Sequence, residues 1–367
     1  MSGLEVKLQQ VNYLKTDRFY IFGAGSSAKM CRHILETNGK TVISFLTSKK
    51  TKTDIVDIPV IYLSNENYSL ELNIPVIIGV FNRESNASMK LISDYLRANN
   101  FLYIISFYDF FDEFSSQIGS LYWLTNRRYY EENMSNYLLV RSLFLEQTSL
   151  EIYSKLLSFL ANFDYNILPL PAPDNQYFPS DLDIWDGKNA FLDIGSFDGQ
   201  TVLDASQKYG KLDTVIAYEP DSTNITLIIK KITQFNPADH FLLIPCGVWA
   251  RTEILKFSSD SGESSAINTF GNISIQCLSL DETLFGVVPG YIKMDIEGAE
   301  YDALLGSVNT IKRYRPALAI CLYHKPEHLF KIPLLIKSWN LNYEFFLRFH
   351  GNNLFETVLY CVPKKNF

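Results

Sequence analysis

Cysteine pairs, long apolar runs and an excess of positive charge are all missing from this 367-residue sequence. The five cysteines are scattered and include no C-x-x-C pair, which argues against a disulfide scaffold or a structural zinc site. No run of about 18 apolar residues is present, so a membrane span is not expected. The polar N-terminus has no apolar signal-peptide core. We therefore expect a cytoplasmic protein, because free thiols persist in that compartment.

The net charge excludes a further class of partner. The sequence has 33 lysine and arginine residues against 40 aspartate and glutamate residues, a formal net charge of −7. Nucleic acids are bound through a basic face, so a nucleic-acid partner is not expected. The composition, 47% hydrophobic and 20% charged, is typical of a folded globular protein, and the length suffices for two domains.

Residues 18–39 and 189–210 share one pattern. Each stretch begins with a short apolar run, breaks at glycines and continues with apolar residues at helical spacing. A strand, a glycine turn and a helix are thus predicted twice. We expect an α/β protein of two Rossmann-like units, of which the N-terminal one is a small parallel-sheet domain.

The predicted domain boundaries follow from composition. Residues 1–118 form the N-terminal unit, and residues 119–175 form a Tyr/Leu-rich helical connector with prolines near its end. Residues 176–367 form the second unit, whose nearly continuous apolar strands fit a parallel sheet buried on both faces. Within it, residues 251–276 predict a hairpin insertion. Tyr177, Phe178 and the connector are expected to cover the crevice of this unit.

The second glycine turn, in FLDIGSFDGQT, carries two acids. Gly195 and Gly199 allow a tight bend and a close approach of the backbone to a ligand. Asp193 and Asp198 place carboxylates beside that bend, where they would repel a pyrophosphate but tolerate a cationic ligand. The alternative is an ordinary strand–helix turn with acidic helix capping.

Carboxylates also end two further predicted strands. Glu219 ends the strand in AYEPD, where a carboxylate can accept both hydroxyls of a ribose, in NAD as well as in other nucleosides. Asp295 ends the strand in YIKMDI, and ligands of doubly wound sheets lie outside the carboxyl ends of the strands. Asp295 is therefore expected to face the same crevice, with helix N-capping as its alternative role.

A histidine follows the next predicted strand, in LYHKPEH. The imidazole of His324 is suited to accepting a hydroxyl proton near neutral pH. His328 lies one helical turn later, but two histidines without a third ligand are weak evidence for a metal. His324 is thus a candidate general base, and the alternative is a structural histidine.

Several of these segments, in this order, resemble the FkbM family of methyltransferases: FLDIGSFDGQT, AYEPD, LSLDETL, YIKMDIEGAEYDALLG and FETVLYCVP. The resemblance runs from about Gln176 onward. It implies a class I methyltransferase sheet, S-adenosylmethionine as the methyl donor, and O-methylation of a sugar, a glycan or a related natural product. The cofactor-binding residues it implies are Asp193, Gly195, Ser196, Phe197, Asp198, Gly199, Thr201, Glu219, Pro220, Asp221, Gly247, Val248, Ser264 and Ser265.

The implied reaction is an in-line displacement, in which the enzyme positions two reactants and removes a proton. We predict His324 as the general base and Asp295 as an orienting carboxylate. Alternatively, Asp295 and Glu297 hold a Mg²⁺ ion that acidifies the acceptor hydroxyl. Both hypotheses fit the sequence. The expected partner is a small-molecule or glycan acceptor, and the aromatic-rich connector is a candidate face for a homo-oligomer.

The first glycine turn has the G-x-G-x-x-A form of a dinucleotide fingerprint. Gly23, Gly25, Ser26 and Ser27 are therefore candidates for a second nucleotide site. No acid ends the strand that follows, which argues against NAD. A substrate-presenting or structural role for this unit is the alternative.

Two other functional classes compete with a methyltransferase. One is an NAD-dependent oxidoreductase or sugar-nucleotide enzyme that uses the first glycine turn, although no Tyr-x-x-x-Lys pair lies near either turn. The other is a non-catalytic binding protein on a methyltransferase fold. The joint presence of Asp193, Glu219, Asp295 and His324 argues against complete loss of activity.

Overall fold

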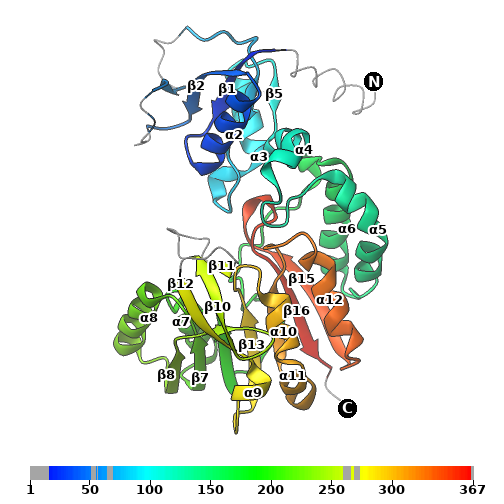
Figure 1. The fold of residues 1–367 in the computed structure, drawn as a ribbon. Helices are drawn as coiled ribbons and strands as arrows, with labels where there is room; N and C mark the ends of the chain where they lie inside the picture. The colour runs from blue at the N-terminus through cyan, green and yellow to red at the C-terminus, as the bar shows by residue number, and fades with distance from the viewer. Residues whose placement is uncertain are drawn as a thin grey trace.

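The structure, a computed structural model, describes residues 16–50, 55, 57–63, 69–258, 266–267 and 273–364. Figure 1 shows an N-terminal α/β unit, a helical connector beside it and a larger C-terminal α/β unit. The predicted fold class is confirmed, while the predicted domain boundaries stay predictions. Among the described residues, none of the helices combines the length and apolarity that a bilayer crossing requires.

The N-terminal unit is built on a parallel sheet with the strand order β3-β2-β1-β4-β5. The strands are β1 (Arg18–Phe22), β2 (Thr41–Thr47), β3 (Val60–Tyr62), β4 (Val76–Ile78) and β5 (Ile104–Ile105). The helices are α2 (Ser26–Thr37), η2 (Ser85–Ala87), α3 (Met89–Ala98) and α4 (Phe107–Ile118). Ile21 and Ile77 in the middle of this sheet are fully buried, as expected for strands covered on both faces.

The connector consists of α5 (Arg127–Arg141), α6 (Gln147–Asn162) and the short η3 (Tyr165–Ile167). Asn126 caps α5 by accepting a hydrogen bond from the amide of Tyr129, which satisfies one of the free N–H groups at a helix start. The two long helices pack on each other and on the last part of the chain. Buried Tyr137 and Tyr153 donate hydrogen bonds to the carbonyls of Pro326 and Leu329, so the connector is fastened to the C-terminal unit.

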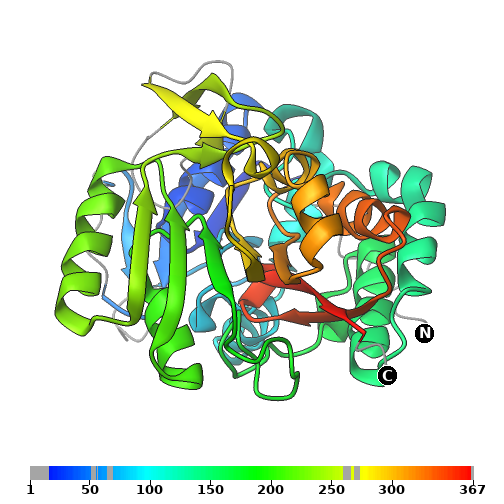
Figure 2. The ribbon, with the colours of Figure 1, turned by 90° about the horizontal axis from the view of Figure 1, so that it is seen from below.

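The C-terminal unit contains a seven-stranded sheet with the order β15-β16-β14-β13-β6-β7-β8. The strands are β6 (Ala190–Ile194), β7 (Leu212–Tyr218), β8 (Ala238–Ile244), β13 (Pro289–Met294), β14 (Ala317–Cys321), β15 (Tyr343–Phe349) and β16 (Thr357–Pro363). The helices are α7 (Gln200–Tyr209), α8 (Ser222–Phe235), α9 (Leu280–Thr283), α10 (Glu300–Leu305), α11 (Val308–Tyr314) and α12 (His328–Ser338), with η4 (Asn352–Leu354) between the last two strands. Figure 2 shows β6, β7 and β8 side by side, with α8 at the outer edge. The strands from β8 to β14 are parallel, and β16 runs antiparallel to both of its neighbours.

The predicted hairpin insertion is present as a separate small sheet. Its strands are β9 (Gly247–Val248), β10 (Glu253–Ser258), β11 (Ala266–Ile267) and β12 (Ile273–Leu278), in the order β11-β10-β12-β9. β10 and β12 pair antiparallel, and β9 joins this pair to the end of β8. The insertion therefore lies at the carboxyl end of the seven-stranded sheet, next to the predicted cofactor turn.

Candidate active site

A cavity of about 440 Å³ opens at the carboxyl ends of β6, β7 and β13. Many of the predicted cofactor-binding residues come together along it, namely Gly195, Ser196, Phe197, Asp198, Thr201, Glu219, Pro220, Gly247 and Val248. Asp193, Gly199 and Asp221 are not among its lining residues. Ser264 and Ser265 lie outside the described residues.

The turn after β6 can be made only by glycine at its first position. Gly195 has a φ of 80°, and a Cβ atom built on it would lie 1.9 Å from the carbonyl oxygen of Asp295. Gly199, with a φ of 78°, precedes the first residue of α7. Between the two glycines, Asp198 forms an ion pair of 2.6 Å with Lys231 on α8. The lack of a side chain at Gly195 therefore lets the backbone of β6 pass directly against the backbone at Asp295.

Asp193 is fully buried and supports the turn from behind. Its carboxylate lies 3.1 Å from the ammonium group of Lys293, its direct neighbour across β6 and β13. Lys293 also donates a hydrogen bond to the carbonyl of Gly195. Burial raises the pKa of Asp193, against the opposing effect of Lys293. Lys293 was not among the predicted site residues, although a lysine inside an apolar strand indicates a buried partner of opposite charge.

Removing this buried cation is expected to destabilise the fold. Lys293→Met leaves the Asp193 carboxylate buried without its partner, which costs about 3–5 kcal/mol of unfolding free energy. Chemical denaturation checks this value. Lys211→Met is the matched control, because Lys211 pairs with Asp239 on the surface with side chains 46% and 60% exposed, where such pairs contribute about 0–1 kcal/mol. Equal effects of the two substitutions would contradict the structural role of Lys293.

Glu219 lies at the end of β7 with 6% of its surface exposed. One carboxylate oxygen accepts a hydrogen bond from the amide of Phe197, and the other accepts one from the amide of Asp221, both at 2.9 Å. Burial raises the pKa of Glu219, while these hydrogen bonds act in the opposite direction. Asp221 accepts hydrogen bonds from two amides at the start of α8, so its role in this structure is helix capping.

Asp295 lines the cavity and is held by two phenols. Tyr177 donates a hydrogen bond of 2.6 Å to Oδ2, and Tyr323 donates one of 3.3 Å to Oδ1. Tyr177 lines the cavity as expected. Phe178 is instead buried against Phe191 and Tyr291. Of the predicted connector, only its last residue, Asn175, lines the cavity, so the expected cover is reduced to Tyr177 and the end of the connector.

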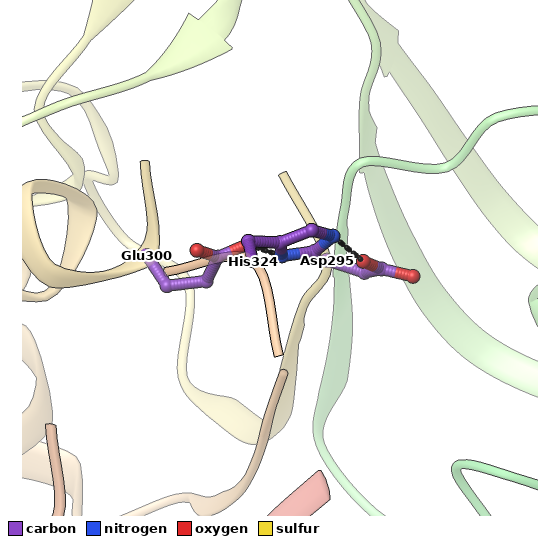
Figure 3. Close-up of side chains that lie close together, drawn as sticks. All are labelled: Asp295, Glu300 and His324. Atoms are coloured by element: carbon purple, nitrogen blue, oxygen red, sulfur yellow. Dashed lines mark ion pairs between the residues drawn. The ribbon is translucent and has the colours of Figure 1, made fainter. Parts of the chain in front are cut away.

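His324 lies between three carboxylates. Its Nδ1 is 2.8 Å from Glu300, and its Nε2 is 3.4 Å from Asp295 and 3.5 Å from Glu297. Figure 3 shows the imidazole between Glu300 and Asp295, nearly in one row. The histidine side chain is only 2% exposed, and the residue is not among those that line the cavity.

The charges of this row follow from burial and pairing. Burial disfavours the charged imidazole of His324, but the nearby carboxylates, Glu300 first, outweigh it and raise its pKa to about 9. Glu300 is buried as well, yet His324 and His328 hold its pKa well below the usual range. At neutral pH the imidazole is therefore protonated. Its assignment as the general base stays a prediction.

Glu297 is a second carboxylate on the cavity wall. Its backbone is left-handed, with a φ of 53°, which is uncommon for a residue with a long side chain. Burial raises its pKa to about 7, against the opposing effect of His324. A carboxyl group with such a pKa changes its charge near neutral pH, which is the property that a general base requires.

Three ligand-type side chains, Asp295, Glu300 and His324, have atoms within 4.8 Å of one another. The imidazole stands between the two carboxylates and pairs with both, whereas a metal site has its ligand atoms converging on one point. Mg²⁺ also prefers oxygen ligands. Asp295 and Glu297 as Mg²⁺ ligands therefore stay a hypothesis.

The N-terminal glycine turn does not line this cavity: Gly23, Gly25, Ser26 and Ser27 are absent from its lining residues. Gly23 has a φ of 110°, and a Cβ atom there would lie 2.8 Å from Val80, so packing alone explains this glycine. α2 begins at Ser26 without a side-chain cap. The second nucleotide site stays a prediction.

Comparisons with known proteins agree with this geometry. Residues 193–345 match the family described as the Methyltransferase FkbM domain. The solved structure of methyltransferase FkbM from Methylobacillus flagellatus KT is similar with a TM-score of 0.76 and 20% identity, over 97% of this chain and 92% of that chain. At this identity the similarity shows the fold.

Smaller proteins resemble only part of the chain. An rRNA methylase from Streptococcus thermophilus (TM-score 0.31, 12% identity) covers 50% of this chain and 91% of its own. Fibrillarin from Aeropyrum pernix, solved with bound S-adenosyl-L-methionine (TM-score 0.33, 11% identity), covers 51% of this chain and 71% of its own. No curated protein matches the chain.

From the family match and the fold together, this chain carries an FkbM methyltransferase domain at residues 193–345, and S-adenosylmethionine is the methyl donor that such a domain implies.

Proposed function

We propose that this protein is an S-adenosylmethionine-dependent O-methyltransferase that acts on a hydroxyl of a sugar, a glycan or a related natural product. One observation carries the proposal: Glu297, a carboxyl group with a pKa of about 7, lines the same cavity as Glu219 and the glycine turn. A hydroxyl acceptor must lose a proton as it is methylated, so a base of this kind next to the donor site suits oxygen as the acceptor atom.

The residues present fit the methyl donor. The turn after β6 lines the cavity with Gly195, Ser196 and Phe197, and Glu219 offers a buried carboxylate for ribose hydroxyls. Gly247 and Val248 are the residues proposed to lie near the adenine. When bound, S-adenosylmethionine supplies an electrophilic methyl group on a sulfonium.

The residues of the chain then position the acceptor and move its proton. Glu297 accepts the hydrogen bond of the reacting hydroxyl and takes its proton. Asp295, held by Tyr177 and Tyr323, orients the acceptor by accepting a hydrogen bond from a neighbouring hydroxyl. His324 stabilises both carboxylates with its charge. In the competing assignment His324 itself is the base. It would then have to be neutral in the working enzyme, and the hydroxyl would have to reach it past the residues of the cavity wall.

Methyl transfer to oxygen is tested by incubating the protein with a donor that carries a deuterated methyl group. Neutral sugars, glycans and sugar nucleotides serve as acceptors, and mass spectrometry locates the label. We expect the label on an acceptor oxygen and an equal amount of S-adenosylhomocysteine as product. Calorimetric titration separates the alternatives: an oxidoreductase binds NAD(H), and a binding protein binds S-adenosylhomocysteine without turnover. A protein that does not bind S-adenosylhomocysteine would remove the proposal.

Removal of divalent metal ions is expected to leave methyl transfer undiminished. The reason is that Asp295 already has tyrosine and histidine partners and therefore does not need a cation to hold it. Turnover is measured before and after treatment with EDTA, with the EDTA-treated protein supplied with Mg²⁺ as the comparison. A loss of turnover that Mg²⁺ restores would instead support Asp295 and Glu297 as metal ligands.

A further inference from the structure

The loop between β15 and β16, residues 350–356, has a strained backbone. Asn353, Leu354 and Glu356 have φ values of 56°, 61° and 58°. Asparagine tolerates this left-handed conformation, whereas leucine and glutamate rarely adopt it. Such conformations persist only where the surroundings impose them, and they are common at functional sites.

The N-terminal unit imposes this conformation. The side-chain amide of Asn353 donates hydrogen bonds of 2.9 Å to the carbonyls of Asn82 and Ala87. Its carbonyl oxygen accepts a hydrogen bond of 2.8 Å from the phenol of Tyr108. The backbone amide of Asn352 donates to the carbonyl of Arg83. A loop of the C-terminal unit is thus shaped by residues about 250 positions earlier in the chain.

The same contact brings a cation of the N-terminal unit to the cavity. Arg83 is one of the residues that line the cavity, together with Asp295 and Glu297. Its guanidinium forms an ion pair of 2.7 Å with Glu356, whose side chain is only 13% exposed, while that of Arg83 is 47% exposed. A largely buried carboxylate therefore anchors the guanidinium, while the Arg83 side chain, nearly half of it exposed, lines the cavity.

The charges at this end of the cavity argue against an anionic acceptor. Among the described residues that line the cavity, the two basic side chains are already paired, Arg83 with Glu356 and Lys293 with Asp193. The same lining contains five carboxylates, namely Asp198, Asp204, Glu219, Asp295 and Glu297. Lys231 pairs with Asp198, and the protonated imidazole of His324 is shared by Asp295, Glu297 and Glu300. Even with the sulfonium of the donor, negative charge therefore exceeds positive charge around the acceptor, which disfavours a phosphate or a carboxylate on it.

We propose that Arg83 is a specificity-determining residue of the acceptor site, and that the acceptor is an uncharged polyhydroxylated compound such as a glycoside. The N–H groups of the guanidinium donate hydrogen bonds to acceptor oxygens. The N-terminal unit is then part of the enzyme's acceptor site. This inference rests on the proposed function and narrows its substrate class.

The test uses the full chain loaded with S-adenosylhomocysteine. The probes are the methyl glycosides of glucose, galactose, mannose and rhamnose, compared with methyl glucuronide and UDP-glucose, and saturation-transfer NMR reports binding. We expect binding of at least one neutral glycoside and none of the two anions. Arg83→Ala should weaken that binding about tenfold or more, with the dissociation constant of S-adenosylhomocysteine unchanged.

Two further variants make the outcome specific to Arg83. Arg97→Ala removes an exposed arginine from the same unit, one that pairs with Asp94, and should leave binding of the glycoside unchanged. Arg83→Lys keeps the charge but not the planar donor fork, so an intermediate affinity is expected.

Each contrary result has its own meaning. Binding of the anions alone, binding of no probe, or glycoside binding that Arg83→Ala leaves unchanged overturns the inference. A protein that does not bind S-adenosylhomocysteine at all overturns the proposed function instead.

Discussion

Replacing Glu219 by alanine is expected to weaken the binding of S-adenosylhomocysteine about a hundredfold or more. A carboxylate that accepts two ribose hydroxyls makes two charge-assisted hydrogen bonds, each contributing about 1.5–3 kcal/mol, and about 1.4 kcal/mol corresponds to a factor of ten in affinity. The substitution also leaves the amides of Phe197 and Asp221 without the acceptor that they have in this structure. The glycine turn would then lose its connection to the end of β7.

Two comparisons assign such a loss to the ribose contact. Glu219→Gln keeps the shape and one carbonyl oxygen, so calorimetric titration should give an intermediate affinity. Asp221→Ala removes only the cap of α8, which costs about 1 kcal/mol of stability and should leave the affinity nearly unchanged. Thermal unfolding of each variant verifies that the fold is intact. If Glu219→Ala binds S-adenosylhomocysteine as tightly as the original protein, the nucleoside lies elsewhere.

Local sequence patterns predicted the architecture because a few neighbouring residues determine whether a segment forms a strand, a turn or a helix. Apolar runs of strand length and glycines at fixed places located β1, β6, β7 and the two turns. Glu219 and Asp295 were expected at strand ends, and both line the cavity. Asp193 differs, because the direction in which a side chain leaves the last residues of a strand depends on the register with the neighbouring strand. In the structure β13 sets Lys293 opposite Asp193, so this acid points into the protein.

Residues that act through long-range contacts could not be predicted in this way. Arg83 reaches the cavity only because its loop packs on residues 351–356, and it pairs with Glu356, 273 positions along the chain. The residues around His324 are also brought there by the tertiary fold. Glu300, which pairs with its imidazole, begins the helix after β13, whereas His324 follows β14. The sequence placed His324 at the correct strand end, but nothing local indicated that three carboxylates would surround its ring.

The largest effect on turnover is expected from Glu297→Gln. Removing a general base lowers the rate about 10²–10⁴-fold, and the amide cannot accept the hydroxyl proton. The affinity for S-adenosylhomocysteine should be retained, because Glu219 and the turn after β6 are untouched. Steady-state kinetics and calorimetric titration measure the two quantities separately. Glu344→Gln, on a partly exposed side chain in a surface pair with Lys364, is the control and should leave both unchanged.

The pH dependence of turnover distinguishes Glu297 from His324 as the base. A base works in its deprotonated form, and burial raises the pKa of Glu297 to about 7, so kcat/KM should fall as the pH drops through about 7 and level off above it. Glu297→Gln should remove this fall. His324 has its pKa raised to about 9 and would be deprotonated only above that value, so as the base it would make kcat/KM rise with pH up to about 9. A rise of this kind in the original protein, abolished by His324→Ala and retained in Glu297→Gln, would assign the proton transfer to His324 instead.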